Sequence, residues 1–296
     1  MTIRIGTSER DGTFHSQGRA LKTIFERRAG LSDVTVLESH SASTENAQRL
    51  AAGEIEFGFM ASNWIARARN GEPPFPRALT LAMAAPMNAG PLFFIARAQS
   101  ALNGVRDLRG KRVAVGQRGS GMVQHAQGIF ATLGLGVEPV YLDFAAGAQA
   151  LAAGEVDAQF QCPIPNKVMT ELAARVDLRV LPYAPGELAA VIDAVPYYRR
   201  TVMRQGAIRG LAADVAQPAV INVLVTHPGM PDAVVRAAVG AIVADSAELA
   251  RLNPLFIGLA DLFEPLRSQG ASALEFGGVA LHPGALAAYR DAGLLR

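Results

Sequence analysis

Short apolar runs alternate along the chain with longer segments of helical periodicity. Residues 3–6, 34–37 and 55–60 have the length and composition of buried strands. After the first of them, apolar positions recur at i, i+4, i+7 and i+11, which predicts a helix ending near residue 28 (Phe14, Gly18, Leu21 and Phe25). Strands that alternate with helices predict βαβ units with parallel sheets.

The middle of the chain breaks this alternation. Residues 79–85 and 91–97 are two consecutive strand patterns without a helix between them, and 218–226 is a long apolar strand. We therefore expect two lobes joined by two crossing strands, about 91–97 and 218–226. Lobe one comprises 1–96 plus 218–296, and lobe two comprises 97–217. Further expected elements are a strand at 139–144, a long helix at about 231–249 and a last helix that begins near Pro283.

The stretch 107–122 combines a polar turn, a short buried strand and a glycine-rich loop, with a helical pattern from Met122 onward. Glycines let backbone N–H groups approach a ligand closely, and the start of a helix adds partial positive charge. The stretch lacks the Lys-Ser/Thr of a P-loop and the spacing of a dinucleotide fingerprint. It therefore predicts an anion-binding loop of unspecified ligand.

Part of this stretch has a counterpart near the N-terminus. Gly6 and Gly116 are 110 positions apart, and so are His15 and His125. A second match, residues 47–56 with 148–157, has an offset of 101. Alanine-rich helices can produce such matches by chance, but two matches in the same order favour a duplication. We expect two similar α/β units, each with a loop and a helix start at the carboxyl end of a strand, where open α/β sheets bind ligands.

Composition narrows the function classes. The 296 residues are 50% hydrophobic with a formal net charge of +2 and no basic run, which makes nucleic acid a poor partner. The single cysteine, Cys162, permits no internal disulfide. No run approaches the ~20 apolar residues of a membrane helix, and no signal peptide is expected in this numbering. The histidines lack ligand spacing, so neither a metal nor another cofactor is expected.

Six stretches, spread over nearly the whole chain, resemble the TAXI-type solute-binding subunits of TRAP transporters. They are Ile5-Gly6-Thr7 with Gly12-Thr13; 41–46; 50–54; 107–121; 152–158; and His282-Pro283-Gly284-Ala285 with Tyr289. The resemblance implies an α/β, two-lobed periplasmic-binding-protein type II fold, each lobe a mainly parallel sheet flanked by helices, with a ligand cleft between. It also implies a periplasmic protein, with cytoplasm as the alternative, that captures a small organic acid such as glutamate or a dicarboxylate. The implied partners are the membrane subunits of a TRAP transporter.

Five loops should converge on the cleft, and they supply mostly neutral donors and backbone N–H groups. They are 7–13, 39–46, 61–64, 117–122 and 161–165. The candidate ligand-binding residues are Thr7, Ser8, Thr13, Ser41, Ser43, Thr44, Ser62, Asn63, Trp64, Gln117, Arg118, Gly119, Ser120, Gly121, Met122 and Gln161.

Several of these residues also suit a purely structural role. Ser43 and Thr44 suit helix N-caps as well as ligand contacts. Arg118 suits a carboxylate clamp or a solvated loop arginine. Ordinary packing is favoured slightly over ligand stacking for Trp64. For His15 and His125, surface or packing roles are favoured over an acid–base pair.

Two other functions compete with solute binding. One is an enzyme on the same fold that acts on a small carboxylic acid, such as a decarboxylase or dehydratase. It would need an acid–base cluster among the loops, where few titratable groups occur. The other is a cytosolic effector-sensing domain, although no helix-turn-helix is attached. Binding without turnover is the expected function, with no catalytic residues.

Overall fold

The computed structural model describes residues 2–10, 12–161 and 166–296, and the protein divides into two compact units. Unit 1 comprises Met1–Ala89 and Ile221–Arg296, and unit 2 comprises Gly90–Val220. The chain passes between them within β4 (Ala82–Pro91) and β11 (Val215–Thr226). The first division therefore lies before the expected position near 96. Among the described residues, β5 (Phe93–Arg97), which was expected to cross between the lobes, pairs with strands of unit 2.

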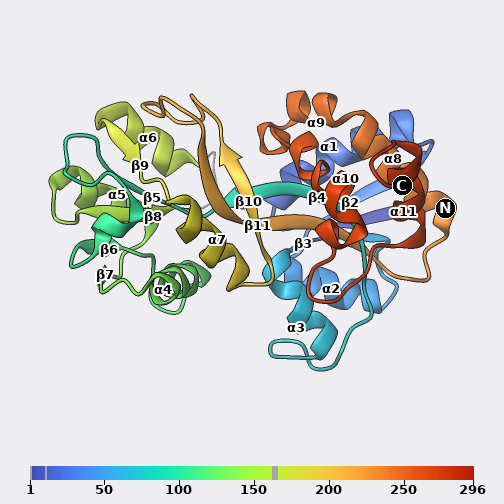
Figure 1. The fold of residues 1–296 in the computed structure, drawn as a ribbon. Helices are drawn as coiled ribbons and strands as arrows, with labels where there is room; N and C mark the ends of the chain where they lie inside the picture. Colours follow the sequence, from blue (N-terminus) through green and yellow to red (C-terminus); the bar gives the residue numbers. More distant parts are fainter. Residues whose placement is uncertain (1, 11, 162–165) are drawn as a thin grey trace. The chain divides into compact units, whose positions relative to one another are not determined.

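Unit 1 is built on a sheet in which β2 (Val34–Leu37), β1 (Ile3–Gly6) and β3 (Phe57–Ala61) are parallel. The unit 1 end of β11 joins β3 in antiparallel orientation. Helices cover both faces of this sheet (Figure 1). They are α1 (Thr13–Arg28), α2 (Ser43–Ala51), α3 (Ile65–Asn70), α8 (Asp232–Ala244), α9 (Ser246–Leu252), α10 (Pro265–Gln269) and α11 (Pro283–Asp291).

Unit 2 repeats this order. The strands β7 (Glu138–Val140), β6 (Arg112–Ala114) and β8 (Ala158–Gln161) are parallel, and β5 joins β8 in antiparallel orientation. The remaining elements are α4 (Gly121–Leu133), α5 (Phe144–Ala153), α6 (Lys167–Arg175), β9 (Leu178–Val180), α7 (Pro185–Asp193) and β10 (Tyr198–Met203). The shared order confirms the prediction of two similar α/β units, and each sheet is mixed because an antiparallel strand follows three parallel ones.

The apolar periodicity of the first helix describes α1 correctly. Phe14, Gly18, Leu21 and Phe25 are all buried, and the helix ends at Arg28 as expected. In unit 2 the two faces of the sheet have different cores. Phe94 packs with Phe160 of β8 and with Phe130 of α4, while Phe93 and Ile95 lie among residues of α5 and α6. Because side chains alternate along a strand, neighbouring residues of β5 serve opposite faces.

Several expected elements have other bounds in the structure, among them the strand expected at 79–85, which is β4 at Ala82–Pro91. The strand expected at 139–144 ends at Val140, because the carboxylate of Asp143 accepts a hydrogen bond from the N–H of Ala146 and caps α5. The helix expected at about 231–249 is divided into α8 and α9. Asp245, at φ −105° and ψ 24°, leaves helical geometry between them. No glycine or proline marks this break, so periodicity alone does not show it.

Candidate functional site

The loop after β1 forms the first candidate corner of unit 1. Thr7 is fully buried, and its Oγ1 donates to the carbonyl of Leu37 at 2.7 Å, which ties the ends of β1 and β2 together. Ser8 is partly exposed, and its Oγ accepts a hydrogen bond from the N–H of His15, the third residue of α1. Thr13, the first residue of α1, is exposed. Thr7 therefore serves the fold, whereas Ser8 and Thr13 lie at an open helix start.

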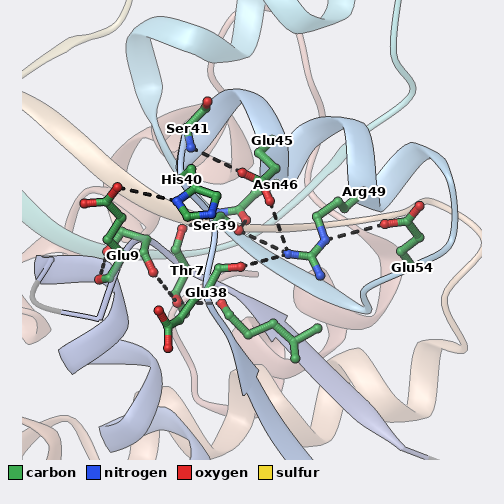
Figure 2. A network of polar contacts seen from close by, with 12 residues as sticks. Thr7, Glu9, Glu38, Ser39, His40, Ser41, Glu45, Asn46, Arg49 and Glu54 are labelled. Atoms are coloured by element: carbon green, nitrogen blue, oxygen red, sulfur yellow. Dashed lines mark hydrogen bonds and ion pairs between the residues drawn. The ribbon is translucent and has the colours of Figure 1, made fainter.

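The carboxyl ends of all three parallel strands in unit 1 are joined by one amide that the sequence did not single out. Asn46 of α2 is fully buried and donates through Nδ2 to the carbonyls of Thr7 at 2.7 Å and Phe59 at 2.9 Å. Its Oδ1 accepts from Ser39 Oγ at 2.6 Å, so the loop after β2 is included (Figure 2). Gly6 and Gly58 are register partners directly beneath it.

Close packing explains these two glycines. A Cβ at Gly6 would lie 2.5 Å from Asn46 Oδ1, and one at Gly58 would lie 3.1 Å from Asn46 Cβ. Side chains at either position would therefore displace the amide from the strand ends. The sequence carries this signal as one glycine at the end of β1 and another inside β3.

The charged side chains of this network lie in and around the loop between β2 and α2. Arg49 of α2 donates to the carbonyl of Glu38 and lies 3.5 Å from Glu54 (Figure 2). His40 and Glu9, 3.6 Å apart, have side chains that are 91% and 70% exposed. A pair this exposed interacts weakly, because water screens its charges.

The predicted capping role of Ser43 and Thr44 is wrong. Both lie inside α2, whose N-cap is Ala42 at φ 42°. Ser43 Oγ accepts from the N–H of Ala61 at the end of β3, and Thr44 Oγ1 donates to the carbonyl of Ser41. The buried Ser43 is thus occupied within the fold, while Ser41 is exposed.

The residues after β3 also have mainly internal partners. Ser62 is 1% exposed, and its Oγ accepts from the N–H of Ile221 on β11 at 3.1 Å. The indole of Trp64 meets the ring of Phe75 edge-on at 6.3 Å and has the Arg67 guanidinium over it at 5.5 Å. Trp64 thus has packing partners within unit 1, and Asn63, between Ser62 and Trp64, is partly exposed.

In unit 2 the glycine-rich loop after β6 leads directly into α4. Gly116 and Gly119 have φ of 108° and 79°, a region that side chains with a Cβ rarely adopt. Ser120 is the N-cap of α4, and its Oγ accepts from the N–H of Val123. Ser120 was expected mainly as a ligand contact, and its hydroxyl already has this structural partner.

The helix starts after β1 and β6 leave the same backbone groups open. In each helix a serine hydroxyl accepts from the third N–H, that of His15 in α1 and that of Val123 in α4. Within the described part of the chain no acceptor contacts the first two N–H groups of either helix (Thr13 and Phe14; Gly121 and Met122). Such N–H groups, with the helix dipole behind them, bind anions.

Arg118 lies in this unit 2 loop beside a tyrosine that the sequence did not indicate. Its guanidinium carbon is 3.8 Å from the ring centroid of Tyr141, which follows β7. Arg118 and Gln117 are both exposed. The stacking restricts Arg118 while leaving its N–H groups available to a carboxylate.

Gln161, at the carboxyl end of β8, is fully buried. Its Oε1 accepts from Asn166 Nδ2 at 3.4 Å, and its Nε2 has no hydrogen-bond partner in the described chain. An amide donor left in this state is costly, so it suits an acceptor that the described residues do not supply. The other residues of the predicted loop at 161–165, Cys162 included, lie outside the described residues.

The strand registers change the sequence offset between the two duplicated units by two residues. The N–H of Thr7 donates to Leu37 as that of Val115 donates to Val140, and Arg4 and Arg112 accept equivalently from the strands beside them. These equivalences, and the helix starts at Thr13 and Gly121, give an offset of 108 in place of 110. His15 and His125 therefore do not hold matching places. His15 Nδ1 lies 3.2 Å from Thr7 Oγ1, and His125 Nδ1 lies 2.7 Å from the hydroxyl of Tyr198.

Comparison with known families matches residues 5–293 to the NMT1-like family. The chain belongs to the NMT1-like family. Its fold is similar to a TctC solute-binding protein from Polaromonas, with TM-score 0.60, 16% identity and 99% and 96% of the two chains covered. It is also similar to the putative periplasmic sulfonate-binding protein SsuA from Methylobacillus flagellatus KT, with TM-score 0.55, 14% identity and coverage of 100% and 88%. The second substrate-binding domain of Lactococcus lactis GlnP gives TM-score 0.53 at 9% identity, with coverage of 88% and 95%.

These neighbours are solute-binding proteins, and at such low identity they establish the type II periplasmic-binding-protein fold for this NMT1-like chain. Among residues 2–10, 12–161 and 166–296, no helix is long and apolar enough to cross a membrane. The same residues contain no group of three or more His, Cys, Asp or Glu side chains arranged to hold a metal ion.

Replacing Ser120 with alanine is expected to lower the free energy of unfolding by about 1 kcal/mol, because α4 loses its N-cap. Ser120→Asp keeps an acceptor for the N–H of Val123 and should stay within about 0.5 kcal/mol of the wild type. Urea unfolding of both variants measures the difference. Equal stability of the alanine and aspartate variants would show that the cap contributes nothing.

His125 is expected to make stability depend on pH. Burial lowers its pKa from 6.5 to about 4. Between these values the unfolded chain binds a proton that the folded protein does not, so stability falls by about 1–3 kcal/mol as pH decreases from 6.5 to 4. Above pH 6.5 this loss is absent. Urea unfolding at pH 4.5 and 7.5 should show that the free energy of unfolding depends less on pH in His125→Gln than in the wild type. An unchanged dependence would contradict this role of His125.

Proposed function

We propose that the protein is a solute-binding protein that captures a small organic acid outside the cytoplasm and delivers it to membrane subunits of a transporter. The open N–H groups at the starts of α1 and α4 carry this proposal. Each pair lies at the carboxyl end of a strand, beside a serine hydroxyl that is held in place by the helix itself. An anion is stabilised there by the N–H groups and the helix dipole, without a full positive charge from the protein.

The charges around these loops favour binding over chemistry. Glu38 accepts two hydrogen bonds from the Arg10 guanidinium, and this partner lowers the pKa of the carboxyl. Glu9 and His40 form the exposed pair already described. A catalytic acid and base need placement within reach of a bound substrate and an environment that tunes their pKa values. The neutral donors of these loops suit retention of a ligand without turnover.

A carboxylate is the ligand that fits this set of groups best. Arg118, held on Tyr141, can donate two parallel hydrogen bonds to a carboxylate, and the unpaired Nε2 of Gln161 offers another donor in the same unit. A dicarboxylate or glutamate would use donors of both kinds. The sequence resemblance to TAXI-type subunits supports a TRAP transporter as the partner.

We expect carboxylates to stabilise the protein against heat. At 100 times Kd a ligand adds about 2.7 kcal/mol of stability, which raises Tm by roughly 4–8 °C. Thermal-shift screening of mono- and dicarboxylates, acidic amino acids, sulfonates, sugars and metal cations measures this directly. Stabilisation by sugars or cations alone would contradict the proposal, and so would consumption of the bound acid, which is measured by chromatography after incubation.

Variants in unit 2 identify which groups hold the acid. Gly121→Val should weaken binding most, because a β-branched side chain blocks approach to the open N–H groups, although no protein atom lies within 4 Å of a Cβ there. Arg118→Ala should weaken binding less, because the neutral N–H groups remain. Calorimetry on both variants decides between a helix-start site and an ionic clamp. Wild-type affinity in both would place the ligand elsewhere.

A further inference from the structure

Three carboxamide side chains from separate parts of the chain meet inside unit 1. Gln17 of α1 donates through Nε2 to Asn88 Oδ1 at 3.0 Å, and Asn222 of β11 donates through Nδ2 to the same oxygen at 3.2 Å. Gln17 is fully buried, Asn88 on β4 is 5% exposed, and Asn222 is partly exposed. We refer to Gln17, Asn88 and Asn222 as the amide cluster.

The amide cluster has hydrogen-bonding capacity that the protein does not use. A carboxamide oxygen accepts two hydrogen bonds, so Asn88 Oδ1 is fully occupied. Gln17 Oε1 is buried and has no partner in the described residues. Burying an acceptor without a donor costs free energy, and the great majority of buried polar atoms avoid it. Gln17 Oε1 can therefore accept a hydrogen bond from a donor that the described residues do not supply.

The position of the amide cluster connects it to the proposed binding loops. Asn222 is the register partner of Ala61, the last residue of β3, so the cluster lies at the carboxyl edge of the unit 1 sheet. Gln17 follows the open N–H groups of Thr13 and Phe14 on the same helix by one turn, about 5.4 Å. Helical side chains lean toward the N-terminus, which directs Gln17 toward that first turn.

The spacing suits a ligand whose donor group is close to its carboxylate. The carboxylate would occupy the helix start, and the donor would reach Gln17 Oε1 one turn further along. The described hydrogen bonds of the amide cluster involve no carboxylate. A buried ammonium group needs an opposite charge nearby, whereas a hydroxyl needs only a neutral acceptor.

We propose that the ligand is a 2-hydroxy acid and that Gln17, positioned by Asn88 and Asn222, selects its hydroxyl group. This rests on the proposed function, since it places the carboxylate at the start of α1. The hydroxyl donates to Gln17 Oε1. A 2-keto acid offers only an acceptor at that place and is disfavoured, and an unsubstituted acid leaves Gln17 Oε1 without a partner.

Calorimetry with two sets of four matched acids tests the selection. The longer set is malate, succinate, oxaloacetate and aspartate, and the shorter set is lactate, propionate, pyruvate and alanine. We expect the hydroxy acid of at least one set to bind tenfold or more tighter than its unsubstituted, keto and amino counterparts. Equal binding of hydroxy and unsubstituted acids, or preference for the keto or amino acid, would overturn the inference and leave the proposed function standing. Absence of binding by all acids would overturn both.

Substitutions then test whether the amide cluster is responsible for the preference for the hydroxy acid. Gln17→Leu removes the acceptor and should reduce the preference for the hydroxy acid to less than threefold, with the affinity for the unsubstituted acid little changed. Asn222→Ala, at a partly exposed position, is a second variant that should reduce the preference by releasing Asn88 and Gln17. Gln48→Leu on α2, an exposed glutamine of the same unit, is the control and should keep the wild-type preference. Retention of that preference in both cluster variants would overturn the inference.

Discussion

Asn46→Ala is expected to lower the free energy of unfolding by about 3–5 kcal/mol. The substitution removes two donors to buried backbone carbonyls, those of Thr7 and Phe59, and the acceptor for Ser39 Oγ. Each buried group left without a partner costs about 1–3 kcal/mol. Because these groups belong to the ends of three different strands, the loss affects the whole carboxyl edge of the unit 1 sheet. Urea unfolding followed by circular dichroism gives the change.

Two further variants distinguish the loss of the Asn46 hydrogen bonds from the loss of its side-chain volume. Asn46→Asp keeps the shape but replaces the donors by acceptors facing two carbonyls, and it should destabilise the protein comparably. Asn63→Ala removes an amide at the partly exposed end of the neighbouring loop and should change stability by less than about 0.5 kcal/mol. A loss below 1 kcal/mol in Asn46→Ala would show that the strand ends are held by other contacts.

Hydrophobic spacing was sufficient to predict most of the architecture. The buried positions of α1 follow a 3.6-residue period, and the strand patterns at 79–85 and 91–97 without a helix between them indicated two units connected by strands. Both inferences depend on which residues are buried, and burial is visible in the sequence as a pattern of apolar positions. The break at Asp245 left no such trace, because neither a glycine nor a proline marks it.

The duplication was detected through identical residues, but those residues gave the wrong offset between the two units. Glycine and histidine matches at an offset of 110 put His15 against His125, but the backbone hydrogen bonds require 108. At 108, Gly18 and Leu21 of α1 correspond to Ala126 and Ile129 of α4, which are also buried. The face of a helix is therefore a better guide to register than shared residue types, which can recur on different faces.

The candidate site could be predicted only as far as its loops. The sequence located the corners after β1, β2, β3 and β6, but it could not distinguish hydroxyls that are available from those used within the fold. Thr7, Ser43 and Ser62 each have an internal partner that is distant in sequence. The amide cluster was missed for the same reason, since Gln17, Asn88 and Asn222 come together only in the folded chain.

Gly284→Ala is expected to lower the free energy of unfolding by about 2–4 kcal/mol, although alanine favours helices more than glycine does. The stretch His282-Pro283-Gly284-Ala285, which contributed to the family resemblance, begins α11 where it packs against α8. A Cβ at Gly284 would lie 2.4 Å from the carbonyl oxygen of Asp232 and 3.0 Å from the backbone nitrogen of Arg236. These are backbone atoms of α8, so they cannot move aside as a flexible side chain would.

Gly240→Ala on α8 is the matched control for this prediction. No protein atom lies within 4 Å of a Cβ at Gly240, so alanine there should stabilise the protein by up to about 1 kcal/mol through helix propensity alone. The same substitution on the two packed helices should thus change stability in opposite directions. Relief of the clash would require α11 to move away from α8, which would also displace Ala285 and Tyr289, both fully buried on the same helix. If the two variants unfold at the same urea concentration, this contact tolerates a methyl group, and close helix packing is not what requires glycine at 284.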